Sequence, residues 1–510
     1  MSVYFEVQNK ASERADHRNS VTETAKLPGF VLCHNYNWDD NQLHNWYCVH
    51  YFDENGGWHV IGDMHLMHVS GESRPQLPDR FESLSEDFCS LGNNVGYYEK
   101  MYAVLGTEKS KEVLAALQDC AVNLVINEKY KGNETYRLSL RRETFETERA
   151  LRMGKFAING RDMKKAFRYN YLFSPPYNSG CVTEWAVDFK TKVHPFMRMA
   201  GVIGENGVGK TQMLYSFIKD LLADKADAFN SELPIFSSII AVCSTPFDEF
   251  MNIESKNYTL PYIKSCVEQN KVETEEKIYS GAEAIKERGI VEGHPLMKYY
   301  IDRLKKELPT EDIESIFPYR DSDVSVQRYW DIDRERLHQV IKNLSSGQLQ
   351  IMMLLTTIYE HVNYDTLFVI DEPEVHLHPN AIMSFLRLLS SLLEEFASYA
   401  IITTHSPLVV REMVGCNVFT MHRMEDNNVY IGHCDRETFG EDIGILYRDI
   451  FGYDDTKSCF REQVKELIAD GDDYEQVIRD LGVENLSLNS RFTIRNMVVE
   501  YQKQKANEKQ

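Results

Sequence analysis

Eight consecutive residues near the middle of the chain have the types and spacing of a phosphate-binding loop. They fit the pattern G-x-x-x-x-G-K-[ST] and are Gly204, Glu205, Asn206, Gly207, Val208, Gly209, Lys210 and Thr211. In such a loop the glycines let backbone N–H groups approach nucleotide phosphates, the lysine pairs with the β- and γ-phosphates, and the last hydroxyl ligates Mg²⁺. The pattern predicts a site for ATP and Mg²⁺, which also includes the next residue, Gln212.

Two carboxylates follow an apolar run and would complete the hydrolytic chemistry. Asp371 and Glu372 come directly after TLFVI at 366–370, which the pattern predicts to be a buried strand. The carboxyl ends of parallel strands meet at one edge of a sheet, so both side chains are expected beside the phosphate loop. There Asp371 would hold Mg²⁺ through water, and Glu372 would be the general base that polarises the attacking water. The alternative is an acidic turn without a catalytic role.

The elements around these residues alternate between strand and helix. Buried strands are predicted at 197–204 and 237–244, and the phosphate loop opens a helix at 211–224. Further on, the pattern predicts helices at 347–362 and 381–397, a strand at 399–405 and a hairpin at 417–432. This alternation predicts an α/β fold with a mostly parallel sheet flanked by helices.

The flanking segments differ in character from this core. The first 75 residues are rich in aromatic and turn residues and predict a β-meander with a hairpin turn at Glu54–Gly57. Residues 251–335 are charged and helical in pattern. The segment Lys129–Arg168 holds twelve Lys/Arg and five Asp/Glu, a net charge of +7. It is interpreted as a solvated helical face, with a nucleic-acid or partner surface as the alternative.

Composition limits the class of protein. The 510 residues carry a net charge of −22, so non-specific coating of nucleic acid is not expected. The ten cysteines contain no C-x-x-C pair, which argues against a zinc ribbon and favours free thiols in a reducing cytoplasm. The N-terminus has no apolar signal region, and no run approaches the roughly 18 apolar residues of a membrane span. A cytoplasmic protein without a membrane partner is expected.

About 140 residues after the phosphate loop lies a second short motif, Leu344–Gln348, with the sequence LSSGQ. It resembles the signature motif of ABC-type ATPases, although Ser346 stands where that motif usually has glycine. The resemblance implies that Ser345 and Gly347 reach the γ-phosphate of ATP held by a second copy, so that two copies form an ATP sandwich. Ser345 would also cap the helix that follows. The resemblance further implies that His405 contacts the γ-phosphate and senses its presence.

The full motif set is similar to the SMC/Rad50/RecF-like branch of ABC ATPases. The segments that carry this likeness are GENGVGKT, LSSGQ, DEPEVHLHP (371–379) and TTHSP (403–407). Other segments resemble the ATPase subunit (PtuA) of the Septu anti-phage defence system, which also occurs in some retron operons; they lie at 37–40, 83–101, 244–250 and 437–441. This likeness implies an ATP-hydrolysing regulatory subunit that controls a partner HNH endonuclease (PtuB-like) through dimer closure. It also implies assembly beyond a dimer, and contact with nucleic acid through the complex.

Two other functions stay open at this point. A DNA-repair ATPase of the RecF or Rad50 kind would need a basic groove or long coiled-coil arms, and 251–335 has no sustained heptad. An ATPase-nuclease of the overcoming-lysogenisation (OLD) type would need a second acidic site, for which only Asp470–Asp472 offers material. No nuclease site of its own is therefore expected. No clear Q-loop glutamine follows the second strand, where Ser244 and Asp248 stand instead.

The expected organisation places the nucleotide site in two separated segments. The expected regions are an N-terminal β-rich part (1–75), a helical and basic insertion (76–190), the phosphate-loop core (191–250), a helical lobe (251–340), the core with signature, carboxylates and histidine (341–435), and a C-terminal helical region (436–510).

Overall fold

The computed structural model describes most of the chain. The described residues are 3–8, 26–34, 44–72, 74–130, 133, 136, 140, 145–178, 180–189, 195–243, 249–254, 260–266, 271–291, 294–321, 328–375, 378–424, 427–452, 458–469, 473–483 and 485–507. The Q-loop position (Ser244, Asp248) and Asp470–Asp472 lie outside them. The chain divides into two compact units, Met1–Phe439 and Gly440–Gln510, and each is described by itself.

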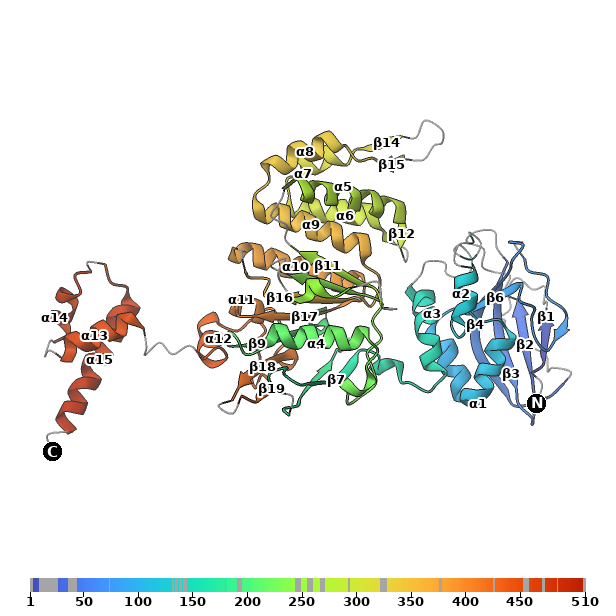
Figure 1. The fold of residues 1–510 in the computed structure, drawn as a ribbon, viewed down its shortest axis with the longest axis horizontal. Helices are drawn as coiled ribbons and strands as arrows, with labels where there is room; N and C mark the ends of the chain where they lie inside the picture. The colour runs from blue at the N-terminus through green and yellow to red at the C-terminus, as the bar shows by residue number, and fades with distance from the viewer. Residues whose placement is uncertain are drawn as a thin grey trace. The chain divides into compact units, whose positions relative to one another are not determined.

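A six-stranded sheet with the order β5-β1-β2-β3-β4-β6 forms the N-terminal part (Figure 1). Its strands are β1 (Phe5–Gln8), β2 (Gly29–His34), β3 (Trp46–Phe52), β4 (Trp58–His68), β5 (Arg80–Phe81) and β6 (Phe88–Gly92). The hairpin predicted at Glu54–Gly57 joins β3 to β4, and the N–H of Asp53 donates to the carbonyl of Gly57 at 2.9 Å. The predicted β-meander is wrong for the first two strands. β1 and β2 pair in parallel, and parallel neighbours require a crossover connection instead of a hairpin.

Helices cover one face of this sheet and share its core. They are α1 (Val95–Ala116), which is kinked at Gly106, α2 (Leu124–Tyr130) and α3 (Phe145–Ala157). Buried residues such as Leu66 of β4, Met101 of α1 and Ala150 of α3 belong to one hydrophobic cluster. Besides these helices, residues 76–190 contain β5, β6 and a later β-hairpin.

The second sheet has seven strands in the order β11-β10-β16-β17-β9-β18-β19 and is parallel except for its last strand. Its strands are β9 (Met199–Gly204), β10 (Ile239–Cys243), β11 (Tyr262–Cys266), β16 (Leu367–Asp371), β17 (Tyr399–Thr404), β18 (Val418–Arg423) and β19 (Val429–His433). The α/β fold of an ABC-type ATPase with a mostly parallel sheet is therefore confirmed.

Both faces of this sheet are covered. One face packs against α4 (Lys210–Leu222) and the hairpin of β7 (Arg168–Phe173) and β8 (Thr183–Asp188), around Trp185 and Phe217. Helix α10 (Pro379–Glu395) lies on the other side of the strands from α4 (Figure 1). All five residues of β16 are buried, as a strand covered on both faces requires.

A helical lobe is inserted between β11 and β16. Its elements are α5 (Lys271–Arg288), β12 (Ile290–Val291), β13 (His294–Pro295), α6 (Leu296–Glu307), α7 (Thr310–Ile316), β14 (Tyr319–Asp321), β15 (Arg328–Trp330), α8 (Arg334–Asn343) and α9 (Ser346–His361). Helix α9 connects the lobe to the sheet, and its Thr356 hydroxyl lies 2.8 Å from the Tyr300 hydroxyl of α6. The chain leaves the lobe through α9 directly into β16.

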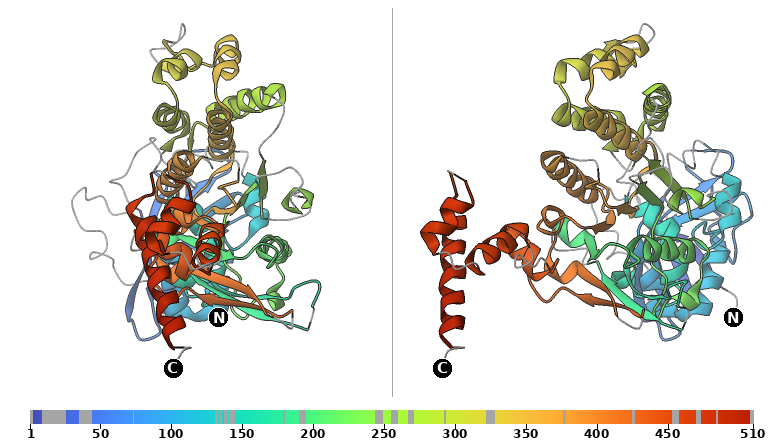
Figure 2. Two further views of the ribbon diagram at one scale, coloured as in Figure 1. Left: turned by 90° about the vertical axis from the view of Figure 1, so that its left-hand side faces the viewer. Right: turned by 60° about the vertical axis from the view of Figure 1, so that its left-hand side comes forward.

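The C-terminal unit is a small helical body. Its helices are α12 (Ile443–Asp449), α13 (Cys459–Ala469), α14 (Tyr474–Asp480) and α15 (Leu488–Asn507). The last three pack together around Val464, Val477 and Ile494 (Figure 2). A further short helix of the first unit, α11 (Pro407–Val410), follows β17. None of the described helices combines the length and the apolar composition that a membrane span requires.

The described part of the basic stretch makes ion pairs within the chain. Arg149 of α3 donates from Nε and Nη2 to the two carboxylate oxygens of Asp365, each at 2.8 Å, and Arg152 donates to the same carboxylate. Asp365 is fully buried just before β16. Arg161 pairs with Glu232 at 2.7 Å. These arginines hold the N-terminal part on the nucleotide core, so they do not form the solvated face that was expected.

Asp365→Asn is expected to lower the free energy of unfolding by about 2 to 3 kcal/mol, because it leaves two arginines facing a neutral group in a buried site. Urea unfolding followed by fluorescence measures this difference. Asp302→Asn, an exposed change of the same kind on α6, is the matched control. Equal unfolding midpoints for the two variants would show that the Asp365 pairs do not stabilise the fold.

Candidate functional site

The phosphate loop joins β9 to α4, as the sequence predicts. Gly207 and Gly209 have φ values of 77° and 107°, which favour glycine, and the loop turns there into the N-terminus of α4. A Cβ on Gly204 would lie 2.3 Å from the carbonyl oxygen of Met421 in the neighbouring strand. The glycines are therefore required by the backbone, and the loop presents the positive end of the α4 dipole.

Lys210 lies over this loop. Only 4% of the residue is exposed, and its Nζ donates to the carbonyl oxygens of Gly204 and Glu205 at 3.2 and 3.3 Å. Burial lowers the pKa of the Lys210 ammonium, while the nearby carboxylates, Glu372 first, oppose this shift. A nucleotide phosphate at the loop would supply the negative charge that such a buried cation favours.

His405 meets Lys210 and Glu372 at the edge of the sheet. Its Nε2 lies 2.6 Å from Nζ of Lys210 and 3.0 Å from Oε1 of Glu372, and that carboxylate lies 3.9 Å from Nζ. Burial and the neighbouring Lys210 cation lower the pKa of His405. The three predicted residues are thus brought together beside the phosphate loop.

Asp371 is held by two hydroxyls at the end of β16. Thr211 Oγ1 donates to its Oδ2 at 2.8 Å, and Thr403 Oγ1 donates to its Oδ1. A hydroxyl and a carboxylate beside a phosphate are the oxygen ligands that Mg²⁺ uses together with waters. Within the described ranges no group of three or more His, Cys, Asp or Glu could hold a metal. The Thr211 hydroxyl and the Asp371 carboxylate are oxygen donors of the kind that would suit a magnesium ion shared with a phosphate.

Glu372 has an unusual backbone conformation. Its φ is 47°, a left-handed value that costs roughly 1–3 kcal/mol for a residue other than glycine. Its N–H is fixed by the carbonyl and the hydroxyl of Thr403, at 3.1 and 3.2 Å. The side chain lines a cavity of 430 Å³, whose lining residues are Glu205, Asn206, Glu372, Glu374, Val375 and His405. The turn thus directs the predicted general base into the space next to the phosphate loop.

The signature residues lie elsewhere in the chain. Ser345 caps α9 in a capping box with Gln348: the Gln348 N–H donates to the Ser345 hydroxyl at 3.3 Å, and the Ser345 N–H donates to Gln348 Oε1 at 3.0 Å. Ser345 is exposed, and a Cβ on Gly347 would meet nothing within 4 Å. Neither residue lines the cavity beside the phosphate loop. One chain therefore does not bring its own signature and phosphate loop together.

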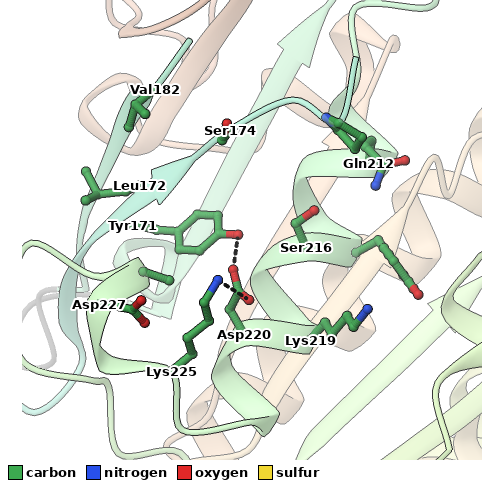
Figure 3. Close-up of a pocket in the computed structure, with 13 residues that line it drawn as sticks. Tyr171, Leu172, Ser174, Val182, Gln212, Ser216, Lys219, Asp220, Lys225 and Asp227 are labelled. Atoms are coloured by element: carbon green, nitrogen blue, oxygen red, sulfur yellow. Dashed lines mark hydrogen bonds and ion pairs between the residues drawn. The ribbon is translucent and has the colours of Figure 1, made fainter. Parts of the chain in front are cut away.

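Gln212 lies outside the phosphate cavity. It lines a hollow of 620 Å³ along the exposed side of α4 (Figure 3). In that hollow the Tyr171 hydroxyl donates to Asp220 at 2.9 Å, and Lys225 pairs with the same carboxylate at 3.5 Å. Gln212, which was predicted to belong to the nucleotide site, therefore lies on the side of α4 that faces β7.

Three residues of the site were not predicted as site residues. They are Glu374, Thr403 and Thr404, which join the turn after β16 to the end of β17. Only their positions in the sequence could have indicated them: Thr403 and Thr404 end an apolar strand, and Glu374 is a third carboxylate after Asp371 and Glu372.

Comparison with known proteins finds one family model and one relative that spans most of the chain. Residues 275–411 match a family model described as "AAA domain, putative AbiEii toxin, Type IV TA system". The chain is 24% identical over 512 residues to protein ea59 of Escherichia phage lambda, spanning 91% of this chain and 93% of that protein.

Solved structures with some likeness include two ABC transporter components. One is cbiO1 from Clostridium perfringens (14% identity, 59% of this chain and 94% of that chain, TM-score 0.29). Another is MJ1267, an ATP-binding cassette in its ADP conformation (11% identity, 56% and 95%, TM-score 0.29). The strand order and the geometry of the site give the chain the α/β fold of an ABC-type P-loop ATPase.

Proposed function

We propose that two copies of this chain close on two molecules of ATP and that each site hydrolyses its ATP across the shared interface. The observation that carries the proposal is the position of Ser345 and Gly347 at the start of α9, away from the cavity of their own chain: Ser345 is exposed, and a Cβ on Gly347 would meet nothing within 4 Å. Ser345 and the helix N-terminus offer hydroxyl and N–H donors suited to a phosphate of the second copy.

Each site would use the residues that meet at the sheet edge. Lys210 neutralises charge on the γ-phosphate, His405 orients it through a ring nitrogen, and Glu372 accepts the proton of the attacking water. Thr211 and Asp371 would hold Mg²⁺, which supplies charge neutralisation on the phosphates. The 2.6 Å approach of Lys210 to His405 leaves two nitrogen groups facing the place where this anion would bind.

We further propose that this ATPase is the regulatory subunit of a prokaryotic anti-phage complex and controls a partner HNH endonuclease (PtuB-like). The family description, which names a toxin system, and the likeness to a phage protein favour such a setting. The engagement of Arg149, Arg152 and Arg161 in ion pairs within the chain weakens the alternative of a DNA-repair ATPase with its own basic groove. In this proposal assembly beyond the dimer occurs in the cytoplasm, and nucleic acid is contacted through the complex.

Mixing two inactive variants tests the composite site. Lys210→Ala inactivates the phosphate loop of one chain, and Ser345→Arg blocks the signature motif of the other chain. Each variant alone is expected to lack ATPase activity. Their mixture regains about a quarter of the wild-type rate, because half of randomly paired dimers are mixed and each mixed dimer has one intact site. A mixture that stays inactive while both variants remain folded and dimerise would contradict a shared site.

The partner nuclease is tested separately by plasmid cleavage with and without ATP. The chain alone, the product of the neighbouring reading frame alone, and the two copurified are compared. Cleavage that requires both supports the regulatory function. Cleavage by this chain alone that survives Glu372→Gln would show that it carries a nuclease site of its own.

A further inference from the structure

Glu374 connects the two turns that carry the catalytic groups. It lies two residues after Glu372, and its side chain reaches the end of the neighbouring strand β17. There its Oε1 accepts hydrogen bonds from the hydroxyl of Thr404, at 2.8 Å, and from the backbone N–H of His405. Hydrogen bonds to an ionised acceptor are about twice as strong as those between neutral groups. One carboxylate therefore bonds directly to the main chain of His405.

The main chain around His405 is held on both sides. The N–H of Ser406 donates to the Thr404 hydroxyl at 2.9 Å, and this hydroxyl in turn donates to Glu374. On the other turn, the N–H of Glu372 donates to Thr403. These bonds run in both directions between the two turns, so the position of the His405 ring relative to Glu372 depends on them.

The second carboxylate oxygen of Glu374, Oε2, makes no hydrogen bond within the described part of the chain. Oε2 is buried, yet the residue lines the cavity beside the phosphate loop. Keeping a carboxylate here costs desolvation that an apolar residue would not incur. Such a cost is typical of residues retained for the chemistry of a site rather than for stability.

We propose that Glu374 is a positioning residue for ATP hydrolysis, which holds His405 in the orientation that faces both the γ-phosphate and Glu372. The inference rests on the proposed hydrolysis at this site. It adds a residue that acts through His405 and does not itself touch the reacting atoms. Loss of its carboxylate frees the turn after β17, and small displacements of a catalytic group cost rate even when binding is kept.

The charges around His405 predict a second measurable effect of Glu374, on the pH dependence of hydrolysis. The groups that face the ring are Lys210 from α4, Glu372 and Glu374 from the turn after β16, and Glu205, which lines the same cavity. Lys210 lowers the pKa of His405, and the carboxylates of Glu372 and Glu374 raise it. Removing the Glu374 charge therefore moves the pKa of His405 downward, and the limb of the pH profile that reports this histidine moves to lower pH.

The test compares the full chain with Glu374→Ala, Glu374→Gln and a matched exposed control on α10, Glu394→Gln. ATP hydrolysis is measured against ATP concentration and pH, and His405→Gln identifies the limb that belongs to the histidine. Glu374→Ala is expected to lower kcat by about tenfold or more, with KM changed by less than about twofold. Glu374→Gln keeps an acceptor oxygen, so its kcat falls less, while its histidine limb still moves to lower pH.

The outcomes separate this inference from the proposed function. A wild-type chain without ATPase activity overturns the proposed hydrolysis itself. An active wild type with Glu374→Ala equal to the control overturns only the role of Glu374, as does a rise in KM at unchanged kcat. If Glu374→Ala unfolds at a lower temperature, the test relies on Glu374→Gln, whose side chain has a similar shape. A Glu374→Gln pH profile whose histidine limb lies at the wild-type pH would contradict the inference.

Discussion

Glu372→Gln is expected to keep ATP bound and to lower kcat for hydrolysis by about 10² to 10⁴. The glutamine fits the same strained turn and can still accept a hydrogen bond, but it cannot take a proton from water. It also removes a negative charge 3.9 Å from Lys210, which favours phosphate binding. The ATP-bound dimer therefore accumulates. Phosphate release measures the rate, and light scattering after gel filtration measures the dimer.

The same substitution at an exposed position provides the control. Glu394→Gln changes the charge of the chain equally but lies away from the site, so its rate and its oligomeric state are expected to match the wild type. A Glu372→Gln rate equal to that of this control would remove Glu372 from the role of general base. Loss of bound nucleotide instead of its retention would mean that the carboxylate supports binding rather than chemistry.

Lys210→Ala is expected to weaken ATP binding by about 100-fold, since it removes the cation that contacts the phosphates. The Lys210 side chain is almost fully buried at the phosphate loop, and no Lys or Arg is among the described residues that line the neighbouring cavity. Without it, Asp371 and Glu372 repel the incoming phosphates. Titration calorimetry of nucleotide with the full chain measures the loss.

Lys225→Ala tests whether this loss is specific. Lys225 follows the same helix but is half exposed and pairs with Asp220 at 3.5 Å. Its removal is expected to leave ATP affinity within about twofold of wild type, as for most surface charges. Equal weakening in the two variants would show that overall charge, and not the contact made by Lys210, determines binding.

The parts of the site that depend on short motifs were predictable from the sequence. The phosphate loop falls between β9 and α4, and Asp371 and Glu372 end β16, because glycine spacing and apolar runs report local backbone requirements. The place of Glu372 beside the phosphate loop followed because carboxyl ends of parallel strands share an edge, whereas the role of His405 was implied by the resemblance to ABC-type ATPases. Ser345 was correctly predicted as a helix cap.

The parts that depend on distant contacts could not be predicted. Nothing local marks Asp365 as the partner of Arg149, which lies 216 residues earlier in the chain. The bond from Glu374 to the main chain of His405 likewise joins turns 31 residues apart. The parallel pairing of β1 with β2 is invisible in alternating hydrophobicity, because that pattern is the same for either direction of a neighbouring strand. Such contacts follow from the tertiary arrangement rather than from periodicity.

The buried pairing of Asp365 with α3 bears on where this protein can be divided. A shortened chain that starts at β7 would keep every motif of the nucleotide site, yet it would leave Asp365 without Arg149 and Arg152. A carboxylate that is fully buried in the whole chain would then lose both of its cationic partners, six residues before Asp371 and just before the strand β16 that ends there. The first 157 residues are therefore not a detachable appendage, and a shortened chain meant to keep the fold of the nucleotide core should include α3.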